Sequence, residues 1–164
     1  MSQTGWFLVI FGLLFQAIGT LMIVYWAVNR QKAARSRSWP TCTGRVLSSR
    51  VLEKTESDEE GGPTTYYQAQ VEYEYTVDGH PYRSNRIAFG TAWTASSAEQ
   101  TETVERYRTG EDVQVHYRPG QPGDAVLDTT PGAGTKVLLI VGIIFDVVGT
   151  AVFLAVFVAN FIIR

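Results

Sequence analysis

The sequence has little of the chemistry on which most enzymes depend. It contains one cysteine, Cys42, and two histidines, His80 and His116. A single cysteine excludes an internal disulfide and a thiolate metal cluster, and neither histidine has a carboxylate or thiol at the spacing of metal ligands. Phosphate-binding glycine loops and nucleophile motifs are also missing. We therefore expect a protein that is not an enzyme and that binds no cofactor or metal.

Charge is missing from both ends of the chain. All charged residues except Asp146 and Arg164 lie between Arg30 and Lys136. A soluble globule spreads its charges more evenly, so this separation indicates apolar segments around one polar domain. The formal net charge is only −2, and no basic face with interleaved aromatic residues is present, so nucleic acid is not an expected partner.

Residues 5–28 form an uncharged run, GWFLVIFGLLFQAIGTLMIVYWAV. At 1.5 Å per residue this helix would measure about 36 Å, enough to cross a hydrocarbon core of about 30 Å. Trp6 at one end and Tyr25 and Trp26 at the other are typical of membrane boundaries. A cleaved signal peptide is the alternative, but in such a peptide basic residues precede a short apolar stretch, whereas here they follow a long one.

Residues 137–163 form a second apolar run, in which Asp146 is the one ionisable residue. A single Asp costs about 2.5–3.5 kcal/mol on insertion scales, which the surrounding Val, Leu, Ile and Phe residues outweigh. We predict two antiparallel transmembrane helices, 5–28 and 137–163, in a two-pass protein of the bacterial inner membrane.

The basic residues of a juxtamembrane linker, residues 29–38, predict the orientation. These are Arg30, Lys32, Arg35 and Arg37. Basic residues near a span stay on the cytoplasmic side, so we expect the central domain in the cytoplasm and both termini outside. The same side chains could contact anionic lipid headgroups, although a topology anchor is the simpler interpretation.

Small residues recur at helical spacing along both predicted spans. They are Gly5, Gly12 and Gly19 in the first and Gly142 and Gly149 in the second. Such positions let helix backbones approach closely in lipid, where packing and hydrogen bonds hold helices together. We expect the two glycine-lined faces to meet.

Gln16 and Asp146 lie on these faces at similar depths, roughly 18 and 15 Å from the same membrane boundary. We predict that they form a hydrogen bond worth about 0.6–2 kcal/mol, with Phe153 near the notch at Gly12. Two other interpretations of Asp146 stay open: a contact with a polar group on a partner's helix, and a proton or ion relay.

Residues 39–131 read as a small α+β domain with a mainly antiparallel sheet. The clearest strand is 66–77, where apolar and polar residues alternate, and Asp78-Gly79 then supplies a tight hairpin turn. Ser96 and Ser97, followed by Glu99 and Gln100, offer capping boxes for one helix. The expected strands are about 43–54, 66–77, 80–89, 112–117 and 125–128, and the expected helix is about 97–108.

These residues resemble the bacterial membrane proteins grouped as domain of unknown function 3592. The matching motifs are WPTCTG at 39–44, Val71-x-Tyr73-x-Tyr75-x-Val77-x-Gly79-x-x-Tyr82, Tyr107-x-x-Gly110, and Val113-x-Val115-x-Tyr117-x-Pro119. The resemblance covers most of residues 39–128 and, in layout, both flanking spans. It implies a bacterial membrane protein with one such domain, and it implies no reaction or catalytic residues.

Three functions are compatible with this organisation. The leading hypothesis is a non-enzymatic accessory or scaffold subunit that joins a membrane protein complex, with membrane lipids and either a membrane-protein partner or a second copy as its contacts. The alternatives are an immunity-type protein that neutralises a membrane-active toxin, and a component of an ion or proton pathway that uses Asp146.

Overall fold

The protein is described from a computed structural model, which covers residues 3–58, 62–132 and 134–161 and gives only the backbone at 3–5, 160 and 161. The chain divides into two compact units. The first contains the residues up to Val28 and those from Thr135 onward, and the second is Asn29–Gly134.

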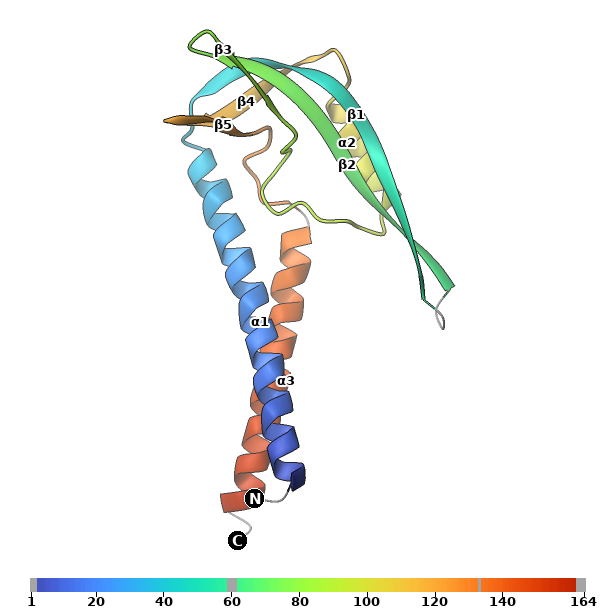
Figure 1. The fold of residues 1–164 in the computed structure, drawn as a ribbon, viewed down its shortest axis with the longest axis vertical. Coiled ribbons are helices and arrows are strands. Elements are labelled where there is room, and N and C mark those ends of the chain that lie inside the picture. Colours follow the sequence, from blue (N-terminus) through green and yellow to red (C-terminus); the bar gives the residue numbers. More distant parts are fainter. Residues whose placement is uncertain (1–2, 59–61, 133, 162–164) are drawn as a thin grey trace. The chain divides into compact units, whose positions relative to one another are not determined.

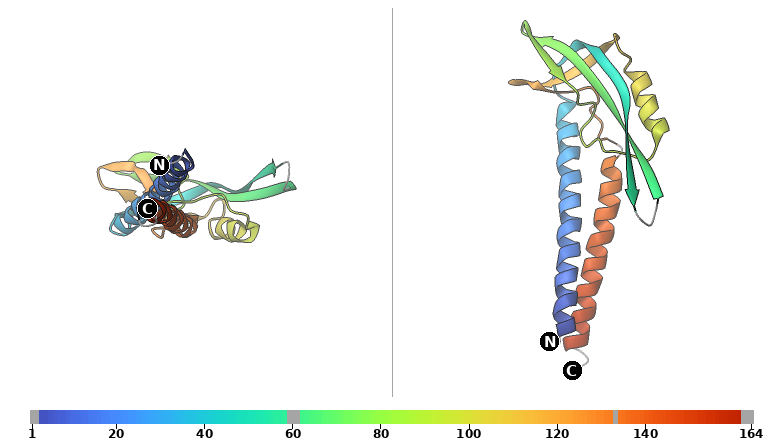
Figure 2. Two further views of the ribbon diagram at one scale, coloured as in Figure 1. Left: turned by 90° about the horizontal axis from the view of Figure 1, so that it is seen from below. Right: turned by 45° about the vertical axis from the view of Figure 1, so that its right-hand side comes forward.

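The first unit is a pair of apolar helices. Helix α1 (Gln3–Ser36) and helix α3 (Gly134–Phe161) lie side by side and run antiparallel (Figures 1 and 2). Both are long and apolar enough to cross a membrane. The second predicted helix starts three residues earlier than expected, and residues 162 and 163 of that prediction lie outside the described part of the chain.

The prediction of a linker at 29–38 was wrong, because α1 continues as a helix to Ser36. Asn29, Ala33 and Ser36 are buried. They follow the i, i+4, i+7 spacing of one helix face, and Ala33 packs in a small cluster with Phe89 and Val126 of the same unit. The end of α1 is therefore part of the domain between the two apolar runs.

The second unit is built on a five-stranded antiparallel sheet with the strand order β3-β2-β1-β4-β5 (Figure 1). Together with helix α2 and the two apolar helices, this sheet confirms the predicted fold class. The strands are β1 (Thr41–Asp58), β2 (Gly62–Val77), β3 (His80–Ser84), β4 (Asp112–Arg118) and β5 (Gln121–Val126).

The hairpin turn between β2 and β3 has the predicted chemistry. Asp78 and Gly79 both have positive φ values, 51° and 80°. A two-residue primed turn requires this conformation at both central positions, and Asp-Gly adopts it readily.

Helix α2 (Ser97–Arg106) ends two residues before the predicted 97–108, at Arg106. Its N-cap is Ser96, whose hydroxyl accepts a hydrogen bond from the Glu99 backbone N–H at 3.4 Å. Gln100 does not form the predicted capping box. Its side-chain oxygen accepts a hydrogen bond from the Ala69 backbone N–H at 2.8 Å. That contact satisfies a donor on the outer edge of β2.

The predicted strand 80–89 stops at Ser84, because the chain leaves β2 and pairs with the segment after β5. The Leu127 N–H donates to the Arg86 carbonyl at 3.4 Å, and the Asp128 N–H donates to the Ile87 carbonyl at 2.7 Å. These bonds connect the two edges of the sheet. A local pairing pattern does not reveal them, because the partners lie some forty residues apart.

Further strand boundaries differ from the sequence expectation, and β2 begins at Gly62 and not at the predicted 66. Strand β1 extends beyond the predicted 43–54 on both sides and contains a bulge between Val46 and Ser48, which shifts its inward-facing positions by one. Strand β5 begins at Gln121, earlier than the predicted 125–128, because Gly120, with φ 76°, permits a tight turn directly after β4.

Candidate functional site

The helix pair is joined by four buried glycines that face one another. Gly12 lies against Gly149, and Gly19 lies against Gly142. A Cβ added at Gly19 would stand 2.7 Å from the Gly142 carbonyl oxygen, and one added at Gly149 would stand 2.8 Å from the Gly12 carbonyl oxygen. Both distances are shorter than any real Cβ contact, so the backbones meet at a separation that only glycine permits.

The spacing of the glycines explains why both contacts form at once. Gly12 and Gly19 are seven residues apart, as are Gly142 and Gly149. A seven-residue repeat keeps the same face toward the partner when two helices wind gently around each other with a left-handed twist. Gly5 belongs to the same repeat but lies outside the residues whose surroundings the structure describes.

The two flanks of this glycine interface differ in chemistry. On one flank Phe15 stacks on Phe145, with ring centroids 4.8 Å apart, and Phe11 contacts Phe15 at 4.5 Å. On the other flank the Thr20 hydroxyl donates to Asp146 Oδ1 at 3.4 Å. One side of the pair is therefore aromatic and the other is polar.

The predicted hydrogen bond between Gln16 and Asp146 is replaced by the contact with Thr20. Every helical side chain tilts toward the N-terminus of its own helix. In an antiparallel pair, Gln16 and Asp146 therefore tilt away from each other although they lie at the same depth. Asp146 reaches toward Gly19 and Thr20, while Gln16 lies against Gly149.

The notch at Gly12 is occupied by Val152 and not by Phe153. The position of a Cβ at Gly12 is 3.4 Å from Val152 Cγ1, whereas Phe153 is exposed. Thr20 and Val152 are among the interface residues that depth and spacing did not identify. The tilt of the Cα–Cβ bond is the signal that would have found Thr20.

The four basic residues at the end of α1 are all exposed. They are Arg30, Lys32, Arg35 and Arg37. Their positions fall outside the face formed by Asn29, Ala33 and Ser36, which is buried in the domain.

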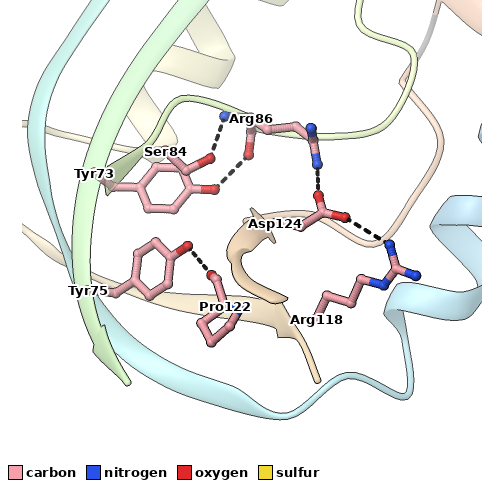
Figure 3. Close-up of polar contacts among 7 residues, drawn as sticks. All are labelled: Tyr73, Tyr75, Ser84, Arg86, Arg118, Pro122 and Asp124. Atoms are coloured by element: carbon pink, nitrogen blue, oxygen red, sulfur yellow. Dashed lines mark hydrogen bonds and ion pairs between the residues drawn. The ribbon is translucent and has the colours of Figure 1, made fainter. Parts of the chain in front are cut away.

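A cluster of polar contacts in the sheet domain lies between β2, β3 and β5 (Figure 3). The hydroxyl of the fully buried Tyr73 donates to the Arg86 carbonyl at 3.0 Å, and the Tyr75 hydroxyl donates to the Pro122 carbonyl at 2.6 Å. The Arg86 guanidinium is paired with Asp124, which also lies 3.8 Å from Arg118. These contacts connect the loop after β3 to the β4–β5 hairpin.

Burial governs the acid–base behaviour of this cluster. It raises the pKa of Tyr75 to about 12 and also raises the pKa of Tyr73 strongly. Both phenols therefore remain neutral hydrogen-bond donors at physiological pH. Each phenol has a structural role, because it donates to a backbone carbonyl of another segment of the same domain.

Cys42 and His116 differ in their surroundings. Burial raises the pKa of the Cys42 thiol, which disfavours the nucleophilic thiolate. His116 Nδ1 is buried and has no hydrogen-bond partner among the described residues. In the same part of the chain, no three His, Cys, Asp or Glu side chains gather in a way that could hold a metal ion.

Two apolar helices that flank one five-stranded α+β domain define the class of this protein. The chain belongs to the family described as domain of unknown function (DUF3592), whose sequence profile matches residues 42–132. The family resemblance found in the sequence motifs is thereby confirmed for the central domain. No curated protein matches the chain.

Proposed function

We propose that the chain is a non-enzymatic integral membrane subunit that joins a membrane protein complex through its two spans and its sheet domain. The observation that carries this proposal is the outer surface of the helix pair. Large apolar side chains are exposed along both helices, among them Phe7 at 74 %, Leu21 at 69 % and Val147 at 62 %. Continuous apolar exposure of this kind is costly in water and favourable in hydrocarbon.

The proposed topology places the sheet domain in the cytoplasm and both termini outside an inner membrane. Support comes from the exposed basic residues that follow the apolar part of α1, because cations close to a span are retained on the cytoplasmic side. The same cations, Arg30, Lys32, Arg35 and Arg37, are placed to attract anionic lipid headgroups.

The outer edge of β1 supports a role in binding a partner protein. Strand β4 pairs only with residues 41–45 of β1, and β2 covers the other edge up to Asp58. Glu53 pairs with Tyr67, whose N–H and C=O are bonded to Thr94 on the far side. The backbone groups of Glu53 therefore point to the outer edge, where an extended peptide could add as a strand.

Copurification from native membranes tests this proposal. We expect the protein to resist extraction with alkaline carbonate and to bring a partner protein with it in mild detergent. Glu53→Pro should weaken that association by removing an edge N–H, and Glu53→Gln, which keeps the N–H, is the matched control. A protein released by carbonate, or one that crosslinks to nothing in native membranes, would overturn the proposal.

A further inference from the structure

The polar flank of the helix pair continues along one outward face of α1. Leu13, Gln16 and Thr20 are all exposed, and their spacing of three and four residues places them in one stripe. This stripe, defined as Leu13, Gln16 and Thr20 and called the polar seam after its two polar members, lies beside the glycine interface. Gln16 borders that interface through its backbone nitrogen and Cβ, which lie 3.1 and 3.3 Å from the position of a Cβ at Gly149.

Gln16 is the residue of the polar seam that lacks a partner. None of the described residues forms a hydrogen bond with its side chain, whereas Thr20 donates to Asp146. If α1 spans a bilayer as proposed above, the Gln16 amide lies roughly 18 Å inside the boundary at Val28. Water is absent at that depth, and a polar group without a hydrogen-bond partner is costly there.

A second copy of this chain fits the polar seam. A carboxamide contains both a donor and an acceptor, so two glutamine side chains complement each other. In two copies with the same topology, related by a twofold axis along the membrane normal, the two Gln16 residues have equal depth and the same tilt. The antiparallel pair inside one chain does not meet this second condition.

We propose that the chain forms a symmetric dimer through α1, with Gln16 of one copy hydrogen-bonded to Gln16 of the second. The spacing of the polar seam is that of a left-handed pair of parallel helices, in which one polar residue sets register and copy number. The aromatic flank with Phe11 and Phe15 then faces lipid. This inference rests on the proposed membrane insertion and adds the identity of one partner.

Cysteine crosslinking of the full-length protein in liposomes tests the geometry. Cys42 is the only native cysteine, so Cys42→Ala gives a background for single additions. Leu13→Cys lies in the polar seam and Phe11→Cys on the aromatic flank, at nearly the same depth, and the native side chains are 52 % and 47 % exposed. We expect oxidation to yield disulfide-linked dimers for Leu13→Cys, and at least tenfold fewer for Phe11→Cys. Equal yields from the two variants would overturn the proposed face.

The energetic test measures the dimer fraction as the protein is diluted in lipid. Gln16→Leu should raise the dissociation constant about three- to thirtyfold, the range expected for hydrogen bonds between membrane helices. Gln16→Asn keeps an amide and should retain more of the dimer. A Gln16→Leu variant that dimerises like the wild type would refute the proposal.

Failure of this inference can be told apart from failure of the proposed function. Protein that resists carbonate extraction but stays monomeric at high protein-to-lipid ratio would remove the dimer and leave membrane insertion intact. Protein extracted by carbonate would overturn the proposed function itself.

Discussion

Packing inside the helix pair and packing inside the sheet domain depend on opposite features of the side chains. The helices meet where side chains are missing, at Gly12, Gly19, Gly142 and Gly149, and their large apolar residues point outward. The sheet domain buries large aromatic rings instead, above all the fully buried Tyr73.

The difference follows from the solvent that suits each unit, which is water for the sheet domain and hydrocarbon for the outer surface of the helix pair. In water, burying a large ring removes apolar surface from the solvent and is the main source of stability. In hydrocarbon, an outward Leu or Phe is already satisfied, so close backbone packing and hydrogen bonds hold helices together. Removing atoms should therefore damage the sheet domain, and adding atoms should damage the helix pair.

The largest expected effect is the loss of a ring from the sheet domain. Tyr73→Ala should lower the free energy of unfolding of the domain by about 3–5 kcal/mol, because it leaves a cavity in the core. Urea titration of the full-length protein in detergent, followed by proteolysis, measures this change. Tyr73→Phe keeps the ring, removes only the hydrogen bond to the Arg86 carbonyl, and should cost about 0.5–1.5 kcal/mol. Equal losses from the two variants would contradict the cavity argument.

The next effect comes from adding one methyl group to the helix pair. Gly19→Ala places a Cβ 2.7 Å from the Gly142 carbonyl oxygen, and we expect it to weaken helix pairing by about 1–3 kcal/mol. Gly12→Ala is the matched control, because its Cβ would meet the Gly149 carbonyl oxygen at 3.3 Å and needs only a small adjustment. Disulfide formation between Phe15→Cys and Phe145→Cys reports pairing in both backgrounds. An undisturbed Gly19→Ala variant would show that the helices are less closely packed than the structure indicates.

The sequence predicted the parts of the fold that local patterns determine. Apolar alternation along 66–77 identified β2, Asp78-Gly79 identified its turn, and the uncharged runs identified both helices. Ser96 identified the start of α2. Each of these signals lies within a few residues of the structure that it specifies.

The sequence did not predict contacts that depend on direction or on distant segments. Gln16 and Asp146 were matched by depth alone, although the tilt of their side chains separates them. The pairing of Arg86 and Ile87 with Leu127 and Asp128 closes the sheet between segments that no short motif connects. The charges at the end of α1 favour a linker in the sequence, although positions 29, 33 and 36 between them are buried in a helix.

Alkaline pH should weaken the sheet domain and leave the glycine interface unaffected. In the unfolded chain Tyr75 loses its proton near pH 10, whereas burial in the fold raises its pKa to about 12. The stability from this residue is complete below pH 10 and is lost as pH rises from 10 to 12. Urea midpoints measured across this range should fall, and Tyr75→Phe should make the fall shallower. A urea midpoint that does not change with pH would contradict the burial of Tyr73 and Tyr75.

The smallest expected effect concerns the ion pairs that close the sheet domain. Asp124→Asn weakens the contacts with Arg86 and Arg118, and we expect a loss of at most about 1 kcal/mol because these groups are only partly buried. The control is Glu102→Gln, which removes the more exposed pair with Arg106 and should change the stability by less than about 0.5 kcal/mol. The Asp124 effect should shrink in high salt, whereas glycine packing in the helix pair contains no charge to screen. Urea midpoints at low and high salt separate the two cases, and a loss from Asp124→Asn that persists in high salt would mean that shape, and not charge, closes the sheet.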